Sequence, residues 1–577
     1  MVQETIYVPK HKLRFVTASS LFDGHDASIN VMRRILQASG AEVIHLGHNR
    51  SVDEVVGAAI QEDVQGIAIS SYQGGHMEYF KYMVDLLRER GAGHIRVFGG
   101  GGGVIIPPEM KELHEYGIAR IFSPEDGRKY GLQGMINQML ELADFSTLTP
   151  EEDAELEKEC DLEQLHVQAK RSVAQLITLA EEVVDGKSPA FLGKTALDVL
   201  TELRAKAKQK KGLAPILGIT GTGGAGKSSL TDELVRRFLE HFPDKHLAII
   251  SIDPSKQKTG GALLGDRIRM NAIHNPRVYM RSLATRKSRT ELSAAIADAI
   301  HVVQAAGFDF IIVETSGIGQ GDAEIIEISD LSMYVMTSEF GAPSQLEKID
   351  MLDYADLIVI NKFDRKGSED ALRDVRKQYQ RNHMLFEARP EELPVFGTMA
   401  SQFHDPGTNQ LFTALIRKIN EKCELGWSLP SFTSQDISKK STIIPGERAQ
   451  YLGDIVQTMK QYKEFMSEQV EIARKLYQIK GTKEAYRQWR NVEAQVAESE
   501  KWAEQLHTLE KYYADQLHPE SKKKLEEWPQ VKAAYAQDEF VTKIRDKEIR
   551  TVLYTESLAG TRIPKVSLPS YEDWEIF

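Results

Sequence analysis

The chain has 577 residues, of which 41% are hydrophobic and 27% charged, and its formal net charge at pH 7 is -12. This length exceeds what one hydrophobic core usually serves, so two or three compact domains with connectors are expected. The negative charge argues against a nucleic-acid-binding protein, and two cysteines make no disulfide framework. Because no apolar run is long enough to span a membrane and the first residues lack the apolar stretch of a signal peptide, we expect a cytoplasmic protein without a membrane partner.

Residues 1–145 alternate short apolar runs with amphipathic stretches. The runs are LRFVTAS, EVIHLG, GIAISS, HIRVFGG and ARIFS, and most are followed by a segment with helical periodicity, such as MEYFKYMVDLLRER. This spacing is typical of βαβ units around a parallel sheet. Five strands with helices between them predict a flavodoxin-like α/β domain.

Residues with distinctive chemistry follow three of these predicted strands. Asp23-Gly24-His25 comes after the first, Ser70-Ser71-Tyr72 after the third, and five glycines at 99–103 after the fourth. Open α/β sheets bind ligands at the carboxyl ends of their strands, and the glycines would let backbone approach a large flat group. One histidine is a poor cage for a free metal ion, but it suffices when a macrocycle supplies the other ligands and Asp23 accepts the second imidazole N–H. The alternative for His25 is a loop histidine that caps the next helix.

The remaining chain divides by its periodicity into four segments. Residues 146–212 are predicted to be a helical linker without strands, and residues 213–425 repeat the α/β pattern as a second doubly wound domain. Residues 426–560 are strongly charged and predict a second helical linker. Residues 561–577 form an extended tail punctuated by proline.

The second domain contains a phosphate-binding loop, GTGGAGKS, between an apolar run and a helical pattern. Its backbone N–H groups would surround phosphate oxygens, while Lys227 reaches the β and γ phosphates and the Ser228 hydroxyl coordinates Mg²⁺. The predicted nucleotide-binding residues of this loop are Gly221, Gly223, Gly224, Ala225, Gly226, Lys227, Ser228 and Ser229.

A base-reading motif, Asn361-Lys362-Phe363-Asp364, ends a later apolar run. The Asp364 carboxylate can accept hydrogen bonds from the ring N–H and the exocyclic amine of guanine, whereas adenine offers no donors there. A site built for such hydrogen bonds discriminates strongly against a base that lacks them. The motif therefore predicts guanine-nucleotide binding, with a plain strand-end turn as the alternative.

The γ-phosphate and the metal need further groups, and two stretches offer them. The run FDFIIV ends in Glu314-Thr315-Ser316-Gly317, which places Glu314 and Thr315 near Mg²⁺ and lets Gly317 offer its N–H to the γ-phosphate. The loop at 253–269 supplies Asp253 and Asp266 as Mg²⁺ carboxylates, with ordinary capping as their alternative. It also supplies Arg269, or else Arg267, for a phosphate, with an exposed salt bridge as the alternative. Lys227 and Glu314 are the predicted catalytic residues.

These motifs resemble those of the metallochaperone family of P-loop GTPases. The phrase IDPSKQKTGGALLGDRIRM is similar to the switch region of the branch that protects adenosylcobalamin-dependent acyl-CoA mutases. The loops of the first domain resemble the D-x-H-x-x-G, S-x-L and G-G elements of the cobalamin-binding domain of methionine synthase and these mutases. Ser28 stands where that family has glycine, and Tyr72 where it has leucine.

The resemblance implies a role for each of these loop residues. His25 would be the lower axial ligand of cobalt, replacing the dimethylbenzimidazole tail of cobalamin, and Asp23 its partner. Ser70 would contact the displaced tail, and the glycine loop would line the tail's channel. The implied cofactor-binding residues are Asp23, His25, Ser70, Tyr72, Gly99, Gly100, Gly102 and Gly103.

Taken together, the two domains resemble the fused isobutyryl-CoA mutase family, in which a cobalamin domain, a GTPase and a TIM barrel that binds acyl-CoA share one polypeptide. Residues 561–577 look like the entrance to that barrel. The resemblance implies interconversion of isobutyryl-CoA and n-butyryl-CoA by adenosylcobalamin when the barrel is present, with GTP hydrolysis gating cofactor loading and protection. It also implies a homodimer and an adenosyltransferase that donates the cofactor. The alternative is a stand-alone GTP-dependent cobalamin carrier or chaperone for a separate mutase subunit.

Overall fold

The computed structural model separates the chain into two compact units, residues 1–438 and 439–577. The described residues are 6–148, 162, 165–191, 193–210, 214–256, 258–286, 292–315, 317, 324–340, 346–347, 349–430, 432, 451–492, 497–544, 547–557, 560–568 and 574. Parts of both predicted linkers and of the predicted tail lie outside these ranges.

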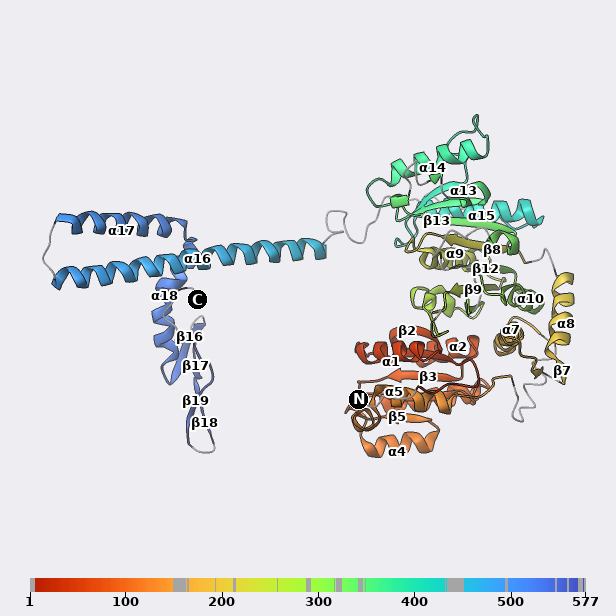
Figure 1. The fold of residues 1–577 in the computed structure, drawn as a ribbon, viewed down its shortest axis with the longest axis horizontal. Coiled ribbons are helices and arrows are strands. Elements are labelled where there is room, and N and C mark those ends of the chain that lie inside the picture. Colours follow the sequence, from red (N-terminus) through yellow and green to blue (C-terminus); the bar gives the residue numbers. More distant parts are fainter. Residues whose placement is uncertain are drawn as a thin grey trace. The chain divides into compact units, whose positions relative to one another are not determined.

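The first sheet of unit 1 is parallel and has the strand order β10-β2-β1-β3-β4-β5 (Figure 1). Its central strand, β1, is buried along its whole length, as a strand covered by helices on both faces should be. The five strands predicted for residues 1–145 are all present, which confirms the flavodoxin-like fold. Their bounds are β1 Arg14–Ser20, β2 Glu42–Arg50, β3 Gly66–Ser70, β4 Arg96–Gly100 and β5 Arg120–Phe122, and the helices are α1 Ala27–Ala38, α2 Val52–Gln61, α3 His76–Glu89, α4 Pro107–Tyr116 and α5 Pro124–Leu142.

A sixth strand of this sheet comes from the second domain, which the sequence did not predict. Strand β10, Ala262–Leu264, lies in the loop at 253–269 and pairs in parallel with β2, with Ala262 opposite Glu42. Gly261 allows the approach, because a Cβ there would lie 2.0 Å from the carbonyl oxygen of Gln37. The Lys12 ammonium also donates to the Gly260 carbonyl at 2.5 Å. The predicted switch loop is therefore the edge strand of the first domain.

The second sheet is also parallel and has seven strands in the order β11-β9-β12-β8-β13-β14-β15. The strands are β8 Ile216–Gly221, β9 Leu247–Asp253, β11 Val278–Ala284, β12 Phe310–Glu314, β13 Leu331–Met336, β14 Leu357–Asn361 and β15 Val395–Thr398. The helical elements are α9 Lys227–His241, η1 Asp266–Arg269, η2 Ala272–His274, α10 Ile296–Ala306, α11 Glu324–Ile328, η3 Ser338–Phe340, α13 Met351–Tyr354, α14 Ser368–Asn382 and α15 Pro406–Cys423. Six of these strands are apolar runs of the kind that predicted the second α/β domain, namely β8, β9, β12, β13, β14 and β15, whereas β11 has Arg281 and Ser282 at its centre and does not stand out in the sequence.

The first linker is part of the core of unit 1. Helix α7, Lys170–Val184, packs against α2 of the first domain and α10 of the second, and α8, Ala196–Gln209, also packs on α10 (Figure 1). Between them, β6 at Ala190–Phe191 and β7 at Lys194–Thr195 form a short hairpin, so the prediction of a linker without strands was wrong. A linker buried on two sides fixes the two sheets relative to each other.

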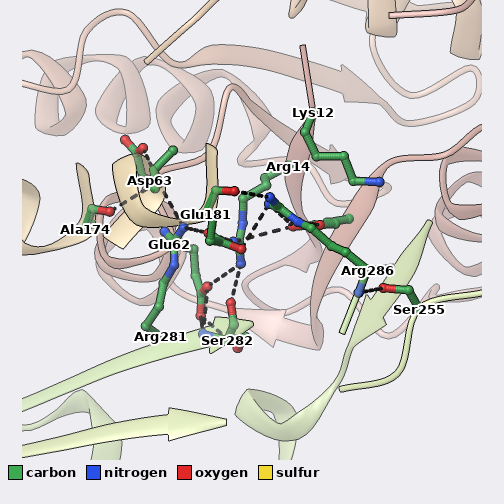
Figure 2. Close-up of polar contacts among 12 residues, drawn as sticks. Lys12, Arg14, Glu62, Asp63, Ala174, Glu181, Ser255, Arg281, Ser282 and Arg286 are labelled. Carbon is green, nitrogen blue, oxygen red and sulfur yellow. Dashed lines mark hydrogen bonds and ion pairs between the residues drawn. The ribbon is translucent and has the colours of Figure 1, made fainter. Parts of the chain in front are cut away.

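The Glu62 carboxylate joins the two sheets directly. It is fully buried at the end of α2 and accepts hydrogen bonds from Arg14 Nη2 at 3.0 Å and from Arg267 Nε at 2.7 Å. It also accepts from the backbone N–H of Ser282 in β11 at 3.0 Å (Figure 2). Since Arg14 belongs to β1 and Ser282 to the second sheet, one carboxylate binds both domains.

Glu181 of α7 forms the second half of this buried network. Its carboxylate pairs with Arg14 at 3.1 Å, Arg281 at 2.7 Å and Arg286 at 3.0 Å, and all four side chains come together in Figure 2. Arg286 reaches on to Glu42 of β2 at 2.9 Å. Buried charges persist only when they are paired, so this network makes the domain interface sensitive to the loss of any partner.

Unit 2 consists of long helices followed by strands. The helices are α16 Tyr451–Val492, α17 Ala497–Gln516 and α18 Pro519–Tyr535, with a small core at Ala473, Leu476 and Leu517. The helical prediction for 426–560 was wrong at its end, where β16 Glu539–Ile544 pairs with β17 Lys547–Val552, and β18 Tyr554–Glu556 pairs with β19 Arg562–Pro564. Among the described residues, no helix combines the length and apolarity that a membrane crossing requires.

Candidate nucleotide and cobalamin sites

The phosphate-binding loop runs from the end of β8 to the start of α9, as the sequence predicts. Gly221 and Gly226 have positive φ angles of 143° and 89°, and a Cβ on Gly221 would lie 1.9 Å from the Val335 carbonyl oxygen. Gly317 packs on this loop, because its own Cβ would lie 1.9 Å from the Gly221 carbonyl oxygen. A side chain at position 221 would collide with Val335, and one at position 317 would collide with Gly221. Both positions therefore require glycine.

A cavity of about 480 Å³ opens beside this loop. Of the predicted residues, Gly224, Gly226, Lys227, Ser228, Asp253, Asp266, Arg269, Glu314 and Thr315 line it, whereas Gly221, Gly223, Ala225 and Ser229 are not among its lining residues. The Lys227 ammonium is buried and donates to the carbonyls of Gly221 at 3.0 Å and Thr222 at 3.3 Å. Gln37, from α1 of the first domain, also lines the cavity.

Hydroxyl and carboxylate groups gather around Ser228 beside the cavity. Ser228 Oγ donates to Glu314 Oε1 at 2.7 Å and lies 3.1 Å from Asp266 Oδ1. Thr231 donates to the other Glu314 oxygen at 2.9 Å, and Ser251 bonds to Asp266. Every one of these groups is an oxygen ligand of the kind that Mg²⁺ takes. Sequence reasoning missed Thr231 and Ser251, although Thr231 lies four residues after Lys227 on the same face of α9.

The positive charges of Lys227 and Arg269 offset the carboxylates of this site only in part. Burial, together with the negative charge of Asp266, raises the pKa of Glu314 well above its ordinary value, and the same two causes raise the pKa of Asp253. Asp253 keeps one hydrogen bond, from the backbone N–H of Gly265 at 3.1 Å. Within the described part of the chain, no three His, Cys, Asp or Glu side chains form a metal cage by themselves. The set suits a divalent cation that takes its remaining ligands from phosphate and water.

Thr315 and the two arginines differ from their predicted roles in part. Thr315 lines the cavity, but its hydroxyl donates to Thr220 at 2.8 Å. Arg269 lines the cavity as predicted. Arg267, the alternative phosphate contact, instead turns toward the first domain, where it pairs with Glu62. Two arginines of η1, separated by one residue, thus face the nucleotide cavity and the cobalamin domain.

The base-reading motif divides its work between structure and recognition. Asn361 holds loops together, since Nδ2 donates to the Ala225 carbonyl at 2.8 Å and Oδ1 accepts from the Ala400 N–H at 3.2 Å. Lys362 Nζ donates to the Gly224 carbonyl at 2.7 Å. Asp364 is exposed and, among the described residues, makes no hydrogen bond or ion pair, so its oxygens remain available to a base.

The histidine of the first domain has the partner that the sequence predicts. His25 Nδ1 lies 2.9 Å from Asp23 Oδ1, and Asp23 Oδ2 accepts the Tyr72 backbone N–H at 2.6 Å. Burial opposes ionisation of Asp23, but the hydrogen bonds from Tyr72 and His25 outweigh it and lower the pKa of this carboxyl. A carboxylate cannot donate, so the proton sits on Nδ1, and the Nε2 lone pair faces outward on a ring that is 76% exposed.

A separate cavity of about 330 Å³ lies behind this histidine, between α1, α5 and the ends of β3 and β4. The predicted residues Ser70, Tyr72, Gly99, Gly100 and Gly102 line it, whereas Gly103 and His25 do not. Most of the other lining residues are apolar, such as Met32, Phe98 and Met139. The cavity is therefore suited to a flat, largely apolar group placed beside His25.

Ser28 gives a direct test of whether a ligand fits. It lines this cavity, and its buried hydroxyl has no hydrogen-bond partner among the described residues. Ser70 Oγ, by contrast, shares a hydrogen bond of 2.9 Å with Ser19. An orphaned buried hydroxyl in an apolar cavity marks a place for a ligand acceptor or donor, so the departure from the family's glycine fits a bound cofactor tail.

The glycine loop has one essential member that sequence reasoning missed. A Cβ on Gly101 would lie 1.9 Å from the Ser71 carbonyl oxygen. A Cβ on Gly99 would also collide, because it would lie 2.5 Å from the Phe80 ring. Gly103, in contrast, has open space around it. The run of five glycines does not reveal which positions are critical, because each glycine looks alike until its neighbours are known.

Known protein families match both domains. Residues 13–126 match the B12 binding domain family, and residues 173–504 match the family described as methylmalonyl Co-A mutase-associated GTPase MeaB. These matches identify cobalamin and guanine nucleotide as the ligands of the two domains.

Curated relatives share both domains in one chain. The fused isobutyryl-CoA mutase of Geobacillus kaustophilus is 63% identical over 99% of this chain and 51% of its own length. The fused isobutyryl-CoA mutase of Cupriavidus metallidurans is 52% identical over 98% of this chain and 49% of its own length. The chain thus spans about half the length of the curated relatives it matches. Among solved structures, a LAO/AO transport system kinase aligns with 19% identity and a TM-score of 0.33, covering 63% of this chain and 99% of its own.

Proposed function

The chain belongs to the family of methylmalonyl-CoA mutase-associated GTPases, MeaB, and we propose that it is the cobalamin-binding and GTP-hydrolysing portion of a fused isobutyryl-CoA mutase. In this proposal the nucleotide state controls how the cobalamin domain loads and protects its cofactor. The observation that carries it is β10, which lies between the Mg²⁺ candidates Asp253 and Asp266 and is the edge strand of the cobalamin sheet. Any movement of the metal carboxylates on hydrolysis acts on that sheet through a few residues of backbone.

GTP hydrolysis depends on the charged groups around the phosphate-binding loop. Lys227 would exchange the loop carbonyls for β and γ phosphate oxygens, and Ser228, Asp266 and Glu314 would hold Mg²⁺, directly or through water. Mg²⁺ would add to the positive charge of Lys227 and so lower the raised pKa of Glu314. The dominant effect is electrostatic stabilisation of the charge that develops on the transferred phosphoryl group.

Adenosylcobalamin supplies the radical chemistry of the carbon-skeleton rearrangement when it is bound. Of this chain's residues, His25 would hold the cobalt through Nε2, and Asp23 keeps the proton on Nδ1 and makes the ring a stronger ligand. Ser28, Ser70 and Tyr72 would contact the displaced tail in the cavity between α1 and α5.

Isomerisation of isobutyryl-CoA to n-butyryl-CoA requires the acyl-CoA-binding barrel, in cis or as a supplied subunit. We also propose a cytoplasmic location, a homodimer and an adenosyltransferase as cofactor donor. Adding acyl-CoA and adenosylcobalamin to the chain, with and without a separately produced barrel from a relative, distinguishes the two candidate functions. Rearrangement only with the supplied barrel supports a mutase portion, whereas cofactor transfer to a separate mutase without rearrangement supports a carrier.

The guanine assignment is tested by Asp364→Asn. The variant replaces a double acceptor with a group that places a donor toward the guanine N–H groups, so the preference for GTP over ATP in kcat/KM should fall by about 10²-fold or more. Exchange of the neighbouring exposed Asp370, which pairs with Arg373 on α14, for Asn is the control and should leave the preference unchanged. Equal preference in the Asp364 variant and the wild type would contradict the assignment.

The cobalt assignment is tested by the EPR spectrum of the cob(II)alamin-loaded chain carrying ¹⁵N-labelled histidine. Coupling of cobalt to the imidazole nitrogen is expected in the wild type and should vanish in His25→Ala. The control is His48→Ala, since His48 is an exposed histidine near the carboxyl end of β2, at the same edge of the sheet as His25. Loss of coupling in the control, or its persistence in His25→Ala, would remove His25 as the ligand.

A further inference from the structure

A third cavity, of about 450 Å³, lies where the first domain, α7 and the second domain meet. Helix α2 forms one wall, the first turn of α7 another, and η1 and η2 the third. It is lined by the cationic side chains Arg90, Lys170, Arg171 and Arg267 and by His274, against the two carboxylates Asp53 and Glu54. Neither the nucleotide cavity nor the cobalamin cavity shares a lining residue with it.

Two nearly fully buried side chains bring unused donors to this cavity. Arg267 is 4% exposed and Gln61 is 7% exposed. Arg267 spends Nε on Glu62 and Nη2 on the Gln61 side-chain oxygen and the Met280 carbonyl, while Gln61 Oε1 also accepts the Met280 N–H at 3.1 Å. In the part of the chain that is described, Arg267 Nη1 and Gln61 Nε2 make no hydrogen bond. These two nitrogens are therefore available to an acceptor that enters the cavity.

Lys170 adds a positive charge without a carboxylate. Its ammonium donates to the Val278 carbonyl at 3.0 Å, and no described Asp or Glu lies within ion-pair distance. Burial, reinforced by the charges of Arg267 and Arg90, lowers the pKa of Lys170 to about 8. The lysine also occupies the first turn of α7, where the helix has no acidic residue and where the helix dipole disfavours a cation.

The two lining carboxylates do not neutralise this group. Asp53 pairs with Arg90 at 2.5 Å, and Glu54 lies 3.4 Å from His274 while accepting the Ser51 N–H at 2.9 Å. Asp53 and Glu54 thus have their own partners. The part of the cavity at Lys170, Arg267 and Gln61 keeps unused donors and, in Lys170, a cation without a carboxylate partner.

We propose that this cavity binds a phosphate-bearing small molecule. A phosphate group accepts several charge-assisted N–H bonds at once, which matches the guanidinium of Arg267, the amide of Gln61 and the ammonium of Lys170. The volume is within the usual range of small-molecule sites and holds a pyrophosphate or a larger phosphorylated metabolite. Because Arg267 follows Asp266, the bound phosphate contacts the same segment that reaches the nucleotide cavity. The proposal is independent of the mutase activity and of cobalamin.

The test is a calorimetric titration of the full chain with inorganic pyrophosphate. GDP and Mg²⁺ are present at saturation, so that the phosphate-binding loop is filled. Saturable binding to the wild type is expected, and Lys170→Met should weaken it by about tenfold or more, the usual effect of losing a charge-assisted bond. Lys187→Met is the matched control, because Lys187 lies just beyond the other end of α7 and pairs with Glu182 at the surface; it should bind pyrophosphate as the wild type does.

Two further measurements keep the result interpretable. Circular dichroism and GDP affinity show whether Lys170→Met is folded, and Arg171→Met provides a second variant at the same wall with the same expected weakening. Parallel titrations with inorganic phosphate, coenzyme A and ADP identify which phosphate source binds most tightly. Absence of pyrophosphate binding to the GDP-filled wild type, or equal affinity in the wild type, both wall variants and the control, would overturn the proposal.

Discussion

The nucleotide site and the cobalamin site of unit 1 satisfy their polar groups in opposite ways. In the nucleotide site, Lys227, Ser228 and Glu314 are buried and bonded within the protein. In the cobalamin site, the Ser28 hydroxyl has no partner among the described residues, and the His25 ring is 76% exposed. The side chains of the nucleotide site are already in place, and a charged ligand would replace some of their internal hydrogen bonds. The second presents groups that only its ligand completes.

The two sites nonetheless share one segment of chain. Residues 253–269 supply two carboxylates to the nucleotide cavity, a strand to the cobalamin sheet and Arg267 to the interface. The nucleotide site and the cobalamin site are therefore connected through residues 253–269, although their polar groups are satisfied in different ways. Substitutions at the domain interface and in the cobalamin domain should therefore change stability and ligand binding by different amounts.

The largest effect on stability is expected from Glu62→Gln, at the interface between the two domains. The variant keeps a hydrogen-bond acceptor but leaves Arg267 buried without a carboxylate and removes one of the carboxylates that Arg14 pairs with. Breaking a buried pair from one side costs about 3–5 kcal/mol of unfolding free energy. Urea denaturation of unit 1 measures it, with Glu202→Gln as control, since the Glu202 pair with Lys194 is exposed and should change stability by less than about 1 kcal/mol. Equal losses in both variants would contradict a buried network.

A smaller effect is expected on the cobalamin side, from the pH dependence of stability through His45. Burial, with the charge of Arg33, lowers the pKa of His45 to about 4, and its ring shares a 2.9 Å hydrogen bond with Thr17. The unfolded state takes up a proton near pH 6.5 that the folded state refuses, so stability is lost as the pH falls from about 6.5 to 4.

This loss amounts to roughly 3 kcal/mol at most, since one pKa unit corresponds to about 1.4 kcal/mol. In His45→Asn, which can keep the bond to Thr17 without titrating, the slope of unfolding free energy against pH between 6.5 and 4.5 should be shallower. Chemical denaturation at several pH values measures both slopes, and identical slopes would show that His45 is not held neutral.

The smallest effect is expected from Ser28→Ala, and its sign differs between two measurements. Removing a buried hydroxyl without a partner should stabilise the ligand-free chain by about 1 kcal/mol. The same change should weaken cobalamin binding severalfold, because the hydroxyl would bond the tail. Thermal unfolding and a cobalamin titration measure the two effects, and a loss of stability without cofactor would show that the Ser28 hydroxyl is already satisfied.

Local sequence patterns predicted most helices and strands. The features that they did not predict depend on contacts between residues far apart in the sequence. The phosphate-binding loop and the Asp23–His25 pair depend on residues close in sequence, so both were predictable. Strand β10 has three residues and no periodicity of its own, and it pairs with β2 more than 200 residues away. Strand β11 was hidden by Arg281, a charged residue that is buried because Glu181 of α7 neutralises it. Gln37 of α1 lines the nucleotide cavity only because the two domains pack together, and the sequence does not show that packing.

The central claim is that nucleotide and cobalamin act on one another through the shared segment at 253–269. The most direct test is the affinity of the chain for cobalamin in three states: without nucleotide, with GDP and Mg²⁺, and with a non-hydrolysable GTP analogue and Mg²⁺. We expect the cobalamin affinity to differ between the GDP and GTP-analogue states by about fivefold or more, and cobalamin to shift the relative nucleotide affinities by the same factor. The same cobalamin affinity in all three states would contradict it.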